Sequence, residues 1–331
     1  MDLLYWLVMK NRIIKILVII LIFFGISTGT NAAKYAGDAF TLGAGGRGLS
    51  LGGAVIAGPF DATAPYWNPA GMNKLQGRYI TAMHAETFGS LLNHDYVGYV
   101  DARPRENSFI KAFGFYIYYL GGGGIKITQL NEFNRPYVVS EESHGDFLFA
   151  AAVSGRIGNS LAFGVTAKII YRDIGTETGK GLTLDAGILY GITSQASLGL
   201  MVSDITSGFI RYSGETFGKG ANTESIYPTI KPGFAYEYKY SDFIGRFLMS
   251  GDIKFEKLGD AAQYSGSSFS MDTHYGWELS YQEIIFGRAG FDIGRFTSGA
   301  GVNIKNIMID LAYLHHSELD ETYRVSAAYR F

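Results

Sequence analysis

The chain ends on the stretch that decides its fold, which reads Tyr-Arg-Val-Ser-Ala-Ala-Tyr-Arg-Phe from Tyr323 to Phe331. On an extended strand, the odd-numbered positions share one face and the even-numbered positions share the other. The odd face is apolar and aromatic, whereas the even face carries two arginines, a serine and one alanine. Strands of outer-membrane β-barrels alternate in this way because one face meets lipid and the other meets the lumen. The stretch therefore predicts the closing strand of such a barrel.

The same alternation recurs along the chain in segments of roughly ten residues, which is the length that tilted membrane strands need. Between Lys231 and Tyr240, the even positions are proline or aromatic and the odd positions are charged or small. Charges at every second position would spread around a helix, but they share one face of a strand. A soluble β-sandwich is the alternative, although its strands usually run to only about 5–6 residues.

We expect an all-β fold, a transmembrane antiparallel β-barrel of about 14 strands, an even number as single-chain bacterial barrels require. The expected strands, with ends uncertain by about 2–4 residues, are roughly 79–86, 95–102, 109–120, 146–157, 161–173, 182–191, 196–204, 230–240, 246–256, 274–282, 284–293, 297–304, 307–315 and 323–331.

Long and short connections should alternate, because such barrels have long external loops and short periplasmic turns. The segments 121–145, 205–229 and 257–273 are long, and 158–160 and 241–242 are short. One position breaks this alternation. The tight turn at 294–296 stands where an external loop is expected, so the rim should be low there.

The N-terminus predicts a secretory signal peptide over residues 1–32. Three basic residues between Lys10 and Lys15 precede an apolar run of ten residues, Ile16–Gly25, and small and polar residues follow it. This is the order of a secretory signal. The run is shorter than the about 20 residues of a membrane-spanning helix, although an uncleaved anchor helix is the alternative. Met9 is a second candidate start.

Composition narrows the class of protein further. The 331 residues carry a net charge of -2, so the chain lacks the basic footprint of a nucleic-acid-binding protein. With no Cys, disulfides and Cys-ligated metals are excluded. The 44 Gly, 23 Tyr and 23 Phe suit closely packed strands with aromatic girdles. We predict an outer-membrane location in a Gram-negative-type envelope, with membrane lipid as the surrounding partner.

Residues 33–77 are Gly-rich and lack strand alternation, so we separate them as a hatch from the barrel at 78–331. Gly43, Gly45 and Gly48 match the G-x-G-x-x-G string, but no strand precedes them and no βαβ unit surrounds them. Gly-rich backbone packed tightly inside a barrel is the better interpretation, because glycine permits close approach.

The chain resembles the PorV/PorQ family, a branch of the FadL-like outer-membrane proteins. The resemblance rests on Gly43–Gly53, on Asp61-Ala-Thr-Ala and above all on Tyr66-Trp-Asn-Pro-Ala-Gly71. It implies that the N-terminal segment is a hatch inside the barrel. The hatch-motif residues that follow from it are Asp61, Asn68, Pro69 and Ala70. Pro59 and Pro65 depart from the family pattern and argue against a long hatch helix.

The same resemblance implies a role for the end of the chain. Outer-membrane barrels present a terminal aromatic residue to the barrel-assembly machinery, and Tyr329 and Phe331 occupy those positions here. We therefore assign barrel closure and assembly to these two residues.

No motif in the sequence indicates catalysis, a cofactor or a metal. The 6 His are scattered, and the adjacent His315 and His316 would point to opposite faces of a strand. No nucleophile lies in a recognisable elbow or triad motif. We predict that the protein is not an enzyme.

Two functions remain open. The first is passage of small, largely hydrophobic molecules across the outer membrane, for which FadL-like transporters are the precedent. The alternative, implied by PorV, is protein handling at the cell surface with type IX secretion components. A mixed-sign charged lumen weakens simple fatty-acid conduction. The expected inward-facing charges are Lys168, Arg172, Lys231, Glu237, Lys239, Arg246, Asp252, Lys254, Glu278, Arg288, Asp292, Arg324 and Arg330.

Overall fold

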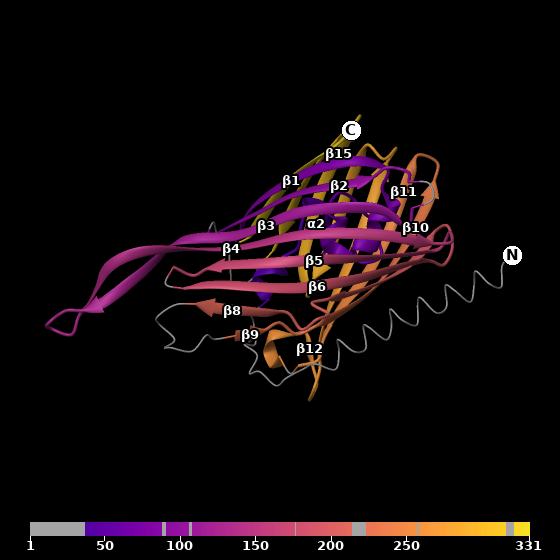
Figure 1. Ribbon diagram of the computed structural model, residues 1–331. Helices are drawn as coiled ribbons and strands as arrows, with labels where there is room; N and C mark the ends of the chain where they lie inside the picture. Colours follow the sequence, from indigo (N-terminus) through magenta and orange to yellow (C-terminus); the bar gives the residue numbers. More distant parts are fainter. Residues whose placement is uncertain are drawn as a thin grey trace, which may run out of the picture.

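The computed structural model describes residues 37–87, 91–105, 108–175, 177–213, 223–256, 258–315 and 321–331. The predicted signal peptide, 1–32, lies outside these residues, as do positions 33–36 of the predicted hatch. Within the described ranges, 14 antiparallel strands form a closed barrel around the N-terminal segment (Figure 1). Among the same residues, no helix is both long and apolar enough to cross a membrane.

Each of the 14 predicted strands is present; β5 has the predicted bounds, and the others have one or both ends shifted. The barrel strands are β1 (Gly77–Thr87), β2 (Leu92–Ala102), β3 (Ile110–Leu130), β4 (Pro136–Ile157), β5 (Leu161–Asp173), β6 (Thr178–Gly191), β7 (Ala196–Ser203), β10 (Thr229–Tyr240), β11 (Phe243–Lys254), β13 (Ser270–Tyr281), β14 (Ile285–Asp292), β15 (Arg295–Ile304), β16 (Ile307–Leu314) and β17 (Thr322–Arg330). Three shorter strands, β8 (Phe209–Ser213), β9 (Thr223–Ser225) and β12 (Tyr264–Ser265), pair beside β6, β8 and β13 outside the ring of 14.

The barrel closes where the last strand pairs with the first. The register of β17 on β1 runs from Arg330 opposite Tyr79 to Tyr323 opposite Glu86. Phe331 extends this closure past the strand, because its N–H donates to the Arg78 carbonyl at 2.9 Å. Closure leaves the ring of 14 strands with no free edge, which is what a lipid environment requires.

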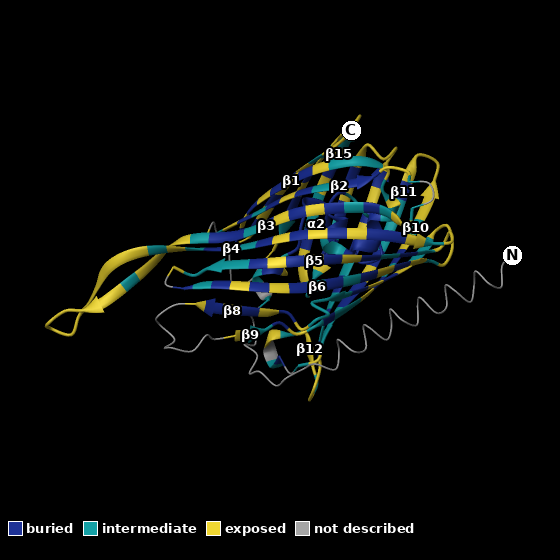
Figure 2. Ribbon diagram, in the orientation of Figure 1, coloured by how far each residue is buried: buried dark blue, intermediate teal, exposed yellow. Residues whose placement is uncertain are grey.

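Exposed and buried residues alternate along the strands (Figure 2). On β5, Val165 and Ile169 are exposed, whereas Thr166 and Lys168 face the lumen and are buried. The predicted faces of this strand are therefore confirmed. Ile170, the apolar residue that interrupts the polar face in the sequence, is buried in the lumen.

The connections differ between the two rims of the barrel. Turns at 158–160, 192–195 and 241–242 lie at one rim, which the loop-length rule assigns to the periplasm. The expected tight turn of the opposite rim is present, since β14 and β15 are joined by only residues 293–294. The rim is low at this point.

The prediction of a long loop at 121–145 is wrong, because most of this segment is β-strand. There, β3 and β4 continue as a two-stranded ribbon that extends beyond the rest of the barrel (Figure 1). The β-branched residues of the segment, among them Ile125, Val138 and Val139, favour an extended backbone. Local propensity therefore continues the strands past the membrane-spanning length.

We predict that Phe234→Lys lowers the free energy of unfolding by about 2–4 kcal/mol, because it places a charge near the middle of the lipid-facing side of β10. Phe234 pairs with Leu198 and Met249, which are both exposed on the outer face. Urea unfolding of the protein in lipid vesicles measures the loss. Phe234→Leu keeps the apolar surface and should stay close to the wild type.

Deletion of Phe331 should lower the fraction of protein inserted in the outer membrane. The deletion removes the backbone hydrogen bonds with Arg78 and the ring that lies 4.6 Å from the Arg78 guanidinium. Heat-modifiable migration of membrane fractions on a gel measures insertion. Phe331→Tyr keeps the aromatic end and should insert normally, and equal insertion after the deletion would contradict the assigned role.

Candidate functional site: the seat of the hatch in the lumen

The hatch consists of short helical turns joined by extended segments. They are η1 (Asp38–Phe40), α2 (Gly46–Ser50), α3 (Ala64–Trp67) and η2 (Pro69–Lys74). None of these described helices exceeds six residues, as the prolines lead us to expect. Pro65 itself lies in the first turn of α3, where a missing N–H costs nothing.

Glycines on the inner wall let the hatch backbone lie directly against the barrel. A Cβ added at Gly276 of β13 would lie 2.6 Å from the Leu51 carbonyl oxygen, and one at Gly164 of β5 would lie 2.5 Å from the Pro69 carbonyl carbon. Both are closer than real Cβ contacts. The wall glycines that meet hatch atoms in this way are Gly114, Gly164, Gly187, Gly199, Gly233, Gly276, Gly290 and Gly299. They form a glycine belt around the hatch.

Wall hydroxyl groups supply hydrogen bonds beside this belt. Thr166 donates to the Pro65 carbonyl at 3.0 Å, Ser197 to the Ala57 carbonyl at 2.9 Å and Thr297 to the Ser50 carbonyl at 3.2 Å. Carbonyls of irregular buried backbone would otherwise lack partners, at a cost of about 1–3 kcal/mol each. The wall is therefore complementary to the hatch in shape and in polarity.

The structure places three of the four hatch-motif residues together on the wall formed by β5 and β6. Asn68 is fully buried, accepts from the Ala70 N–H at 3.1 Å and donates to the carbonyls of Ile56 and Ile188. Pro69 lies against Gly164 and Gly187. Ala70 is fully buried in a cluster with wall residues of the same two strands. These contacts anchor the end of the hatch next to β1.

Asp61 lies apart from that group and has a local role. Its carboxylate accepts from the backbone N–H and the hydroxyl of Thr63, at 2.7 and 2.6 Å. This is an Asx turn that leads into α3. Asp61 also lines a small gap that it shares with Arg47 of α2.

Two aromatic residues beside the motif hold the fold of the hatch. The Tyr66 hydroxyl accepts from the Gly43 N–H at 3.1 Å and donates to the Phe40 carbonyl at 2.9 Å. Burial raises the pKa of the Tyr66 phenol, so it keeps the proton that it donates. Trp67 donates its indole N–H to the Ala44 carbonyl at 2.9 Å. The start and the end of the hatch are joined in this way.

Arg47 is the hatch residue that sequence reasoning missed. It is buried on α2 and makes a bidentate ion pair with Glu278 of β13, with distances of 2.9 and 2.7 Å. Burial opposes its charge, but the Glu278 carboxylate outweighs burial, so the pKa of Arg47 is raised above its usual value. An arginine within a Gly-rich apolar run is a signal that could have found the pair, because a buried charge needs a partner.

Many of the lumen charges that the sequence predicts are matched in ion pairs, whereas the buried Arg324 donates to the Leu42 carbonyl at 2.9 Å. Lys168 lies 2.7 Å from Asp185 and 2.8 Å from Asp204. His274 lies 2.9 Å from Asp292. Lys231 pairs with Asp252, and Arg172 pairs with Asp146. Each ion pair is less polar, as seen by a neighbouring molecule, than an isolated charged side chain would be.

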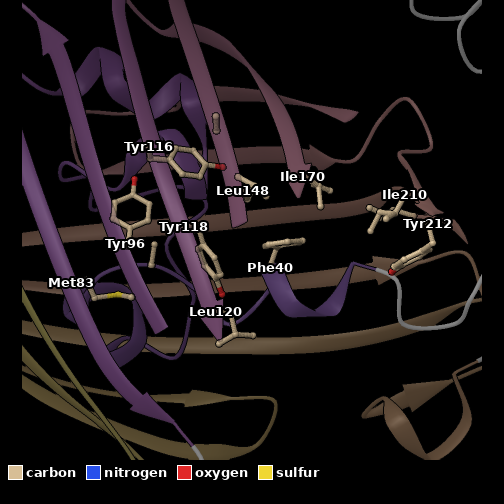
Figure 3. Packing of buried hydrophobic residues seen from close by; sticks show 13 residues of the cluster. Phe40, Met83, Tyr96, Tyr116, Tyr118, Leu120, Leu148, Ile170, Ile210 and Tyr212 are labelled. Carbon is tan, nitrogen blue, oxygen red and sulfur yellow. The ribbon is translucent and has the colours of Figure 1, made fainter. Parts of the chain in front are cut away.

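Aromatic and aliphatic side chains fill the space between these pairs and the cell-surface rim. Phe40 of η1 lies between Tyr118 of β3 and Ile210 and Tyr212 of β8 (Figure 3). The Phe40 and Tyr118 rings meet edge to face with centroids 5.8 Å apart. The start of the hatch and the strand β8 therefore belong to one apolar cluster.

A cavity of about 90 Å³ lies between the hatch and the wall. Phe40, Tyr66 and Trp67 of the hatch line it, and so do apolar wall residues such as Leu148 and Ile170. The Lys168 and Lys231 ion pairs border the same space. The cavity combines an apolar surface with a few neutralised polar groups, as small-molecule sites commonly do. Within the described part of the chain, no group of three or more His, Asp or Glu side chains is placed to hold a metal ion.

Gly276→Ala should displace the hatch while the barrel still folds. The added methyl group overlaps the Leu51 carbonyl, and overpacking of this kind costs about 1–3 kcal/mol. The measurement is the rate of maleimide labelling at Ala54→Cys, a fully buried hatch position in a chain that has no other Cys. Labelling should accelerate. Gly287→Ala is the control, because a methyl group there meets no described atom within 4 Å; equal rates in both variants would contradict the seating.

Comparison with known proteins identifies the fold. No protein-family model and no curated protein matches the sequence. The solved structure of CymD, a monoaromatic hydrocarbon channel, matches with a TM-score of 0.56 at 11% identity, over 88% of this chain and 98% of CymD. A TodX deltaS2S3 mutant, also a monoaromatic hydrocarbon channel, matches with a TM-score of 0.53 at 10% identity, over 87% of this chain and 99% of its own.

A FadL homologue from Pseudomonas aeruginosa matches with a TM-score of 0.53 at 11% identity, over 87% of this chain and 98% of its own. These structural matches establish the fold alone, because the sequence identities are low. The finer resemblance to PorV/PorQ stays a prediction. The closed barrel with an apolar outer face is that of an outer-membrane β-barrel protein, and its fold is similar to the fold of these hydrocarbon channels and of the FadL homologue.

Proposed function

We propose that this protein passes small, largely hydrophobic molecules across the outer membrane. The observation that carries the proposal is the cavity between hatch and wall, which aromatic and aliphatic side chains line. The solved structures described as monoaromatic hydrocarbon channels share the fold, which supports the same class of cargo. The small molecules themselves are then the ligands of the lumen.

The charged lumen does not oppose this proposal. Each lysine that borders the cavity has an aspartate within 2.8 Å. A paired and hydrogen-bonded charge presents less polarity to a passing molecule than a single one does. A small aromatic molecule could therefore contact the apolar lining without separating buried charges.

Passage requires that the hatch move. An apolar cavity that binds benzene has a volume of about 150 Å³, whereas this one has about 90 Å³. The observed arrangement is therefore a closed one. The start of the hatch is the part to displace, because Phe40 lines the cavity and also belongs to the apolar cluster that includes β8.

The alternative of protein handling with type IX secretion components gains no support from the comparisons and stays a prediction. A role for the assembly machinery as a partner is likewise a proposal, based on the terminal position of Tyr329 and Phe331.

A reversible cross-link tests whether the hatch gates passage. A Cβ at Gly37 would lie 3.9 Å from the Ile226 Cβ, within the about 3.5–4.5 Å of a disulfide. Gly37→Cys with Ile226→Cys would therefore tie the start of the hatch to the surface loop after β9. The chain has no other Cys to interfere.

The assay is uptake of the hydrophobic fluorescent probe N-phenyl-1-naphthylamine by cells that lack their own channels of this type. Wild-type protein should raise the uptake rate severalfold over empty cells. Oxidation of the double variant should return it to the background, and a reductant should restore it, whereas Gly37→Cys alone should not respond. Uptake equal to that of empty cells would overturn the proposed function, and unimpeded uptake through the oxidised variant would overturn gating by the hatch.

A further inference from the structure

Glu278 gathers three arginines, and only one of them belongs to the hatch. Its carboxylate accepts two hydrogen bonds from Arg47, one from Arg246 at 2.6 Å and one from Arg288 at 2.7 Å. Arg246 comes from β11 and Arg288 from β14, the two strands that flank β13. The Glu278 side chain is fully buried. One carboxylate therefore joins three neighbouring wall strands and also holds the hatch.

The wall part of this cluster remains complete when the hatch is absent. Arg246 also pairs with Glu237 at 2.6 Å, and Arg288 also pairs with Asp310 at 2.6 Å. If Arg47 departs, the three cations of Arg246, Arg288 and Lys239 still face four carboxylates, which belong to Glu278, Glu237, Asp310 and Glu283. Glu278 is then compensated, and the excess negative charge of the wall attracts Arg47 back.

This arrangement changes the cost of breaking the ion pair. Removing one partner of a buried ion pair is strongly destabilising when the other partner is left uncompensated. The Glu278 carboxylate stays compensated without Arg47, because Arg246 and Arg288 remain bound to it. Arg47 lines a vestibule of about 480 Å³ together with residues of the short turn 192–195. Its guanidinium can therefore reach water without crossing the packed core of the hatch.

The two ends of the hatch are held differently. Asn68 hydrogen-bonds to the wall through Ile188, Asn73 donates to the Gly155 carbonyl at 3.1 Å, and the backbone then continues into β1. The α2 end has no such covalent attachment to the barrel. It is held by Arg47, by its backbone contacts with the glycine belt and by hydrogen bonds with Ser326, His274 and Thr297 of the wall.

We propose that Glu278 is a positioning residue for the α2 end of the hatch. It latches α2 through Arg47, and this contact is released when residues 37–60 move while 68–75 stay on the wall. The inference rests on the proposed function for its purpose, since a gate is needed only where molecules pass. Its geometry, however, is independent of the cargo.

The test uses the Ala54→Cys reporter and needs no transport. Arg47→Gln should speed maleimide labelling at least tenfold and leave the thermal transition of the barrel, followed by heat-modifiable migration, near that of the reporter alone. Arg47→Lys, which keeps the charge but loses the bidentate fork, should fall between the two. Lys74→Gln removes the same charge from the anchored end of the hatch and is the matched control, with an unchanged labelling rate.

Glu278→Gln should speed labelling as well, and it should also lower the thermal transition because it releases Arg246 and Arg288. In the double variant of Arg47→Gln and Glu278→Gln, labelling should be no faster than with Glu278→Gln alone, since the two changes break the same contact. Additive rates, or an Arg47→Gln rate equal to that of the reporter alone, would overturn the latch. Faster labelling together with no probe uptake in any variant would instead overturn the proposed function and leave the latch standing.

Discussion

Lipid offers no hydrogen bonds to a backbone, and this constraint governs the whole molecule. Every strand in the bilayer must pair on both sides, so the sheet has to close. Closure is made by β17 on β1, in register from Arg330 to Tyr323. A closed ring of 14 strands, however, has a lumen wider than its own side chains fill, unlike an eight-stranded barrel. The hatch follows from that surplus space.

The hatch creates a second hydrogen-bonding requirement, because the carbonyls and N–H groups of its irregular, buried backbone also need partners. The wall meets it with three kinds of residue on the inner face. Glycines allow close approach of the hatch, hydroxyl groups such as Thr166 and Ser197 donate to its carbonyls, and charged groups pair across the remaining space. The side chains of the inner face are consequently small, polar or charged because they have to bind the hatch, whatever molecule passes through the barrel. A polar lumen in the sequence is therefore weak evidence against a hydrophobic ligand.

The strands could be predicted from the sequence because the signal is local and repeated. Alternation between Lys231 and Tyr240 reports which side faces lipid, and the structure agrees. The contacts of the inner face are harder to predict from the sequence. Ala235 lies on it as expected, yet it packs with Leu51 of the hatch and Leu248 in a buried apolar cluster. Nothing local to β10 says that the hatch covers this position, since the contact joins residues far apart in the chain.

The residues of the candidate site also differ in whether a local sequence pattern reveals them. Asn68, Pro69 and Ala70 were found through a contiguous motif, whereas Arg47 and Glu278 are separated by 231 positions and share no motif. Glu278 was identified only as one inward-facing charge among many. What distinguishes it is that three arginines converge on it, and convergence is a property of the closed barrel.

The contrast between Asn68 and Arg47 also suggests how a plug can be firm and still movable. Asn68 binds the wall by an amide that is fully buried and adjacent to the point where the chain enters β1. To release it would expose unsatisfied groups on both sides, which is expensive. Arg47 binds a carboxylate that keeps two other cations, beside a vestibule that water can enter. The motif that the sequence shows most clearly is therefore best understood as the anchor, and the contact that yields first lies at the opposite end of the hatch.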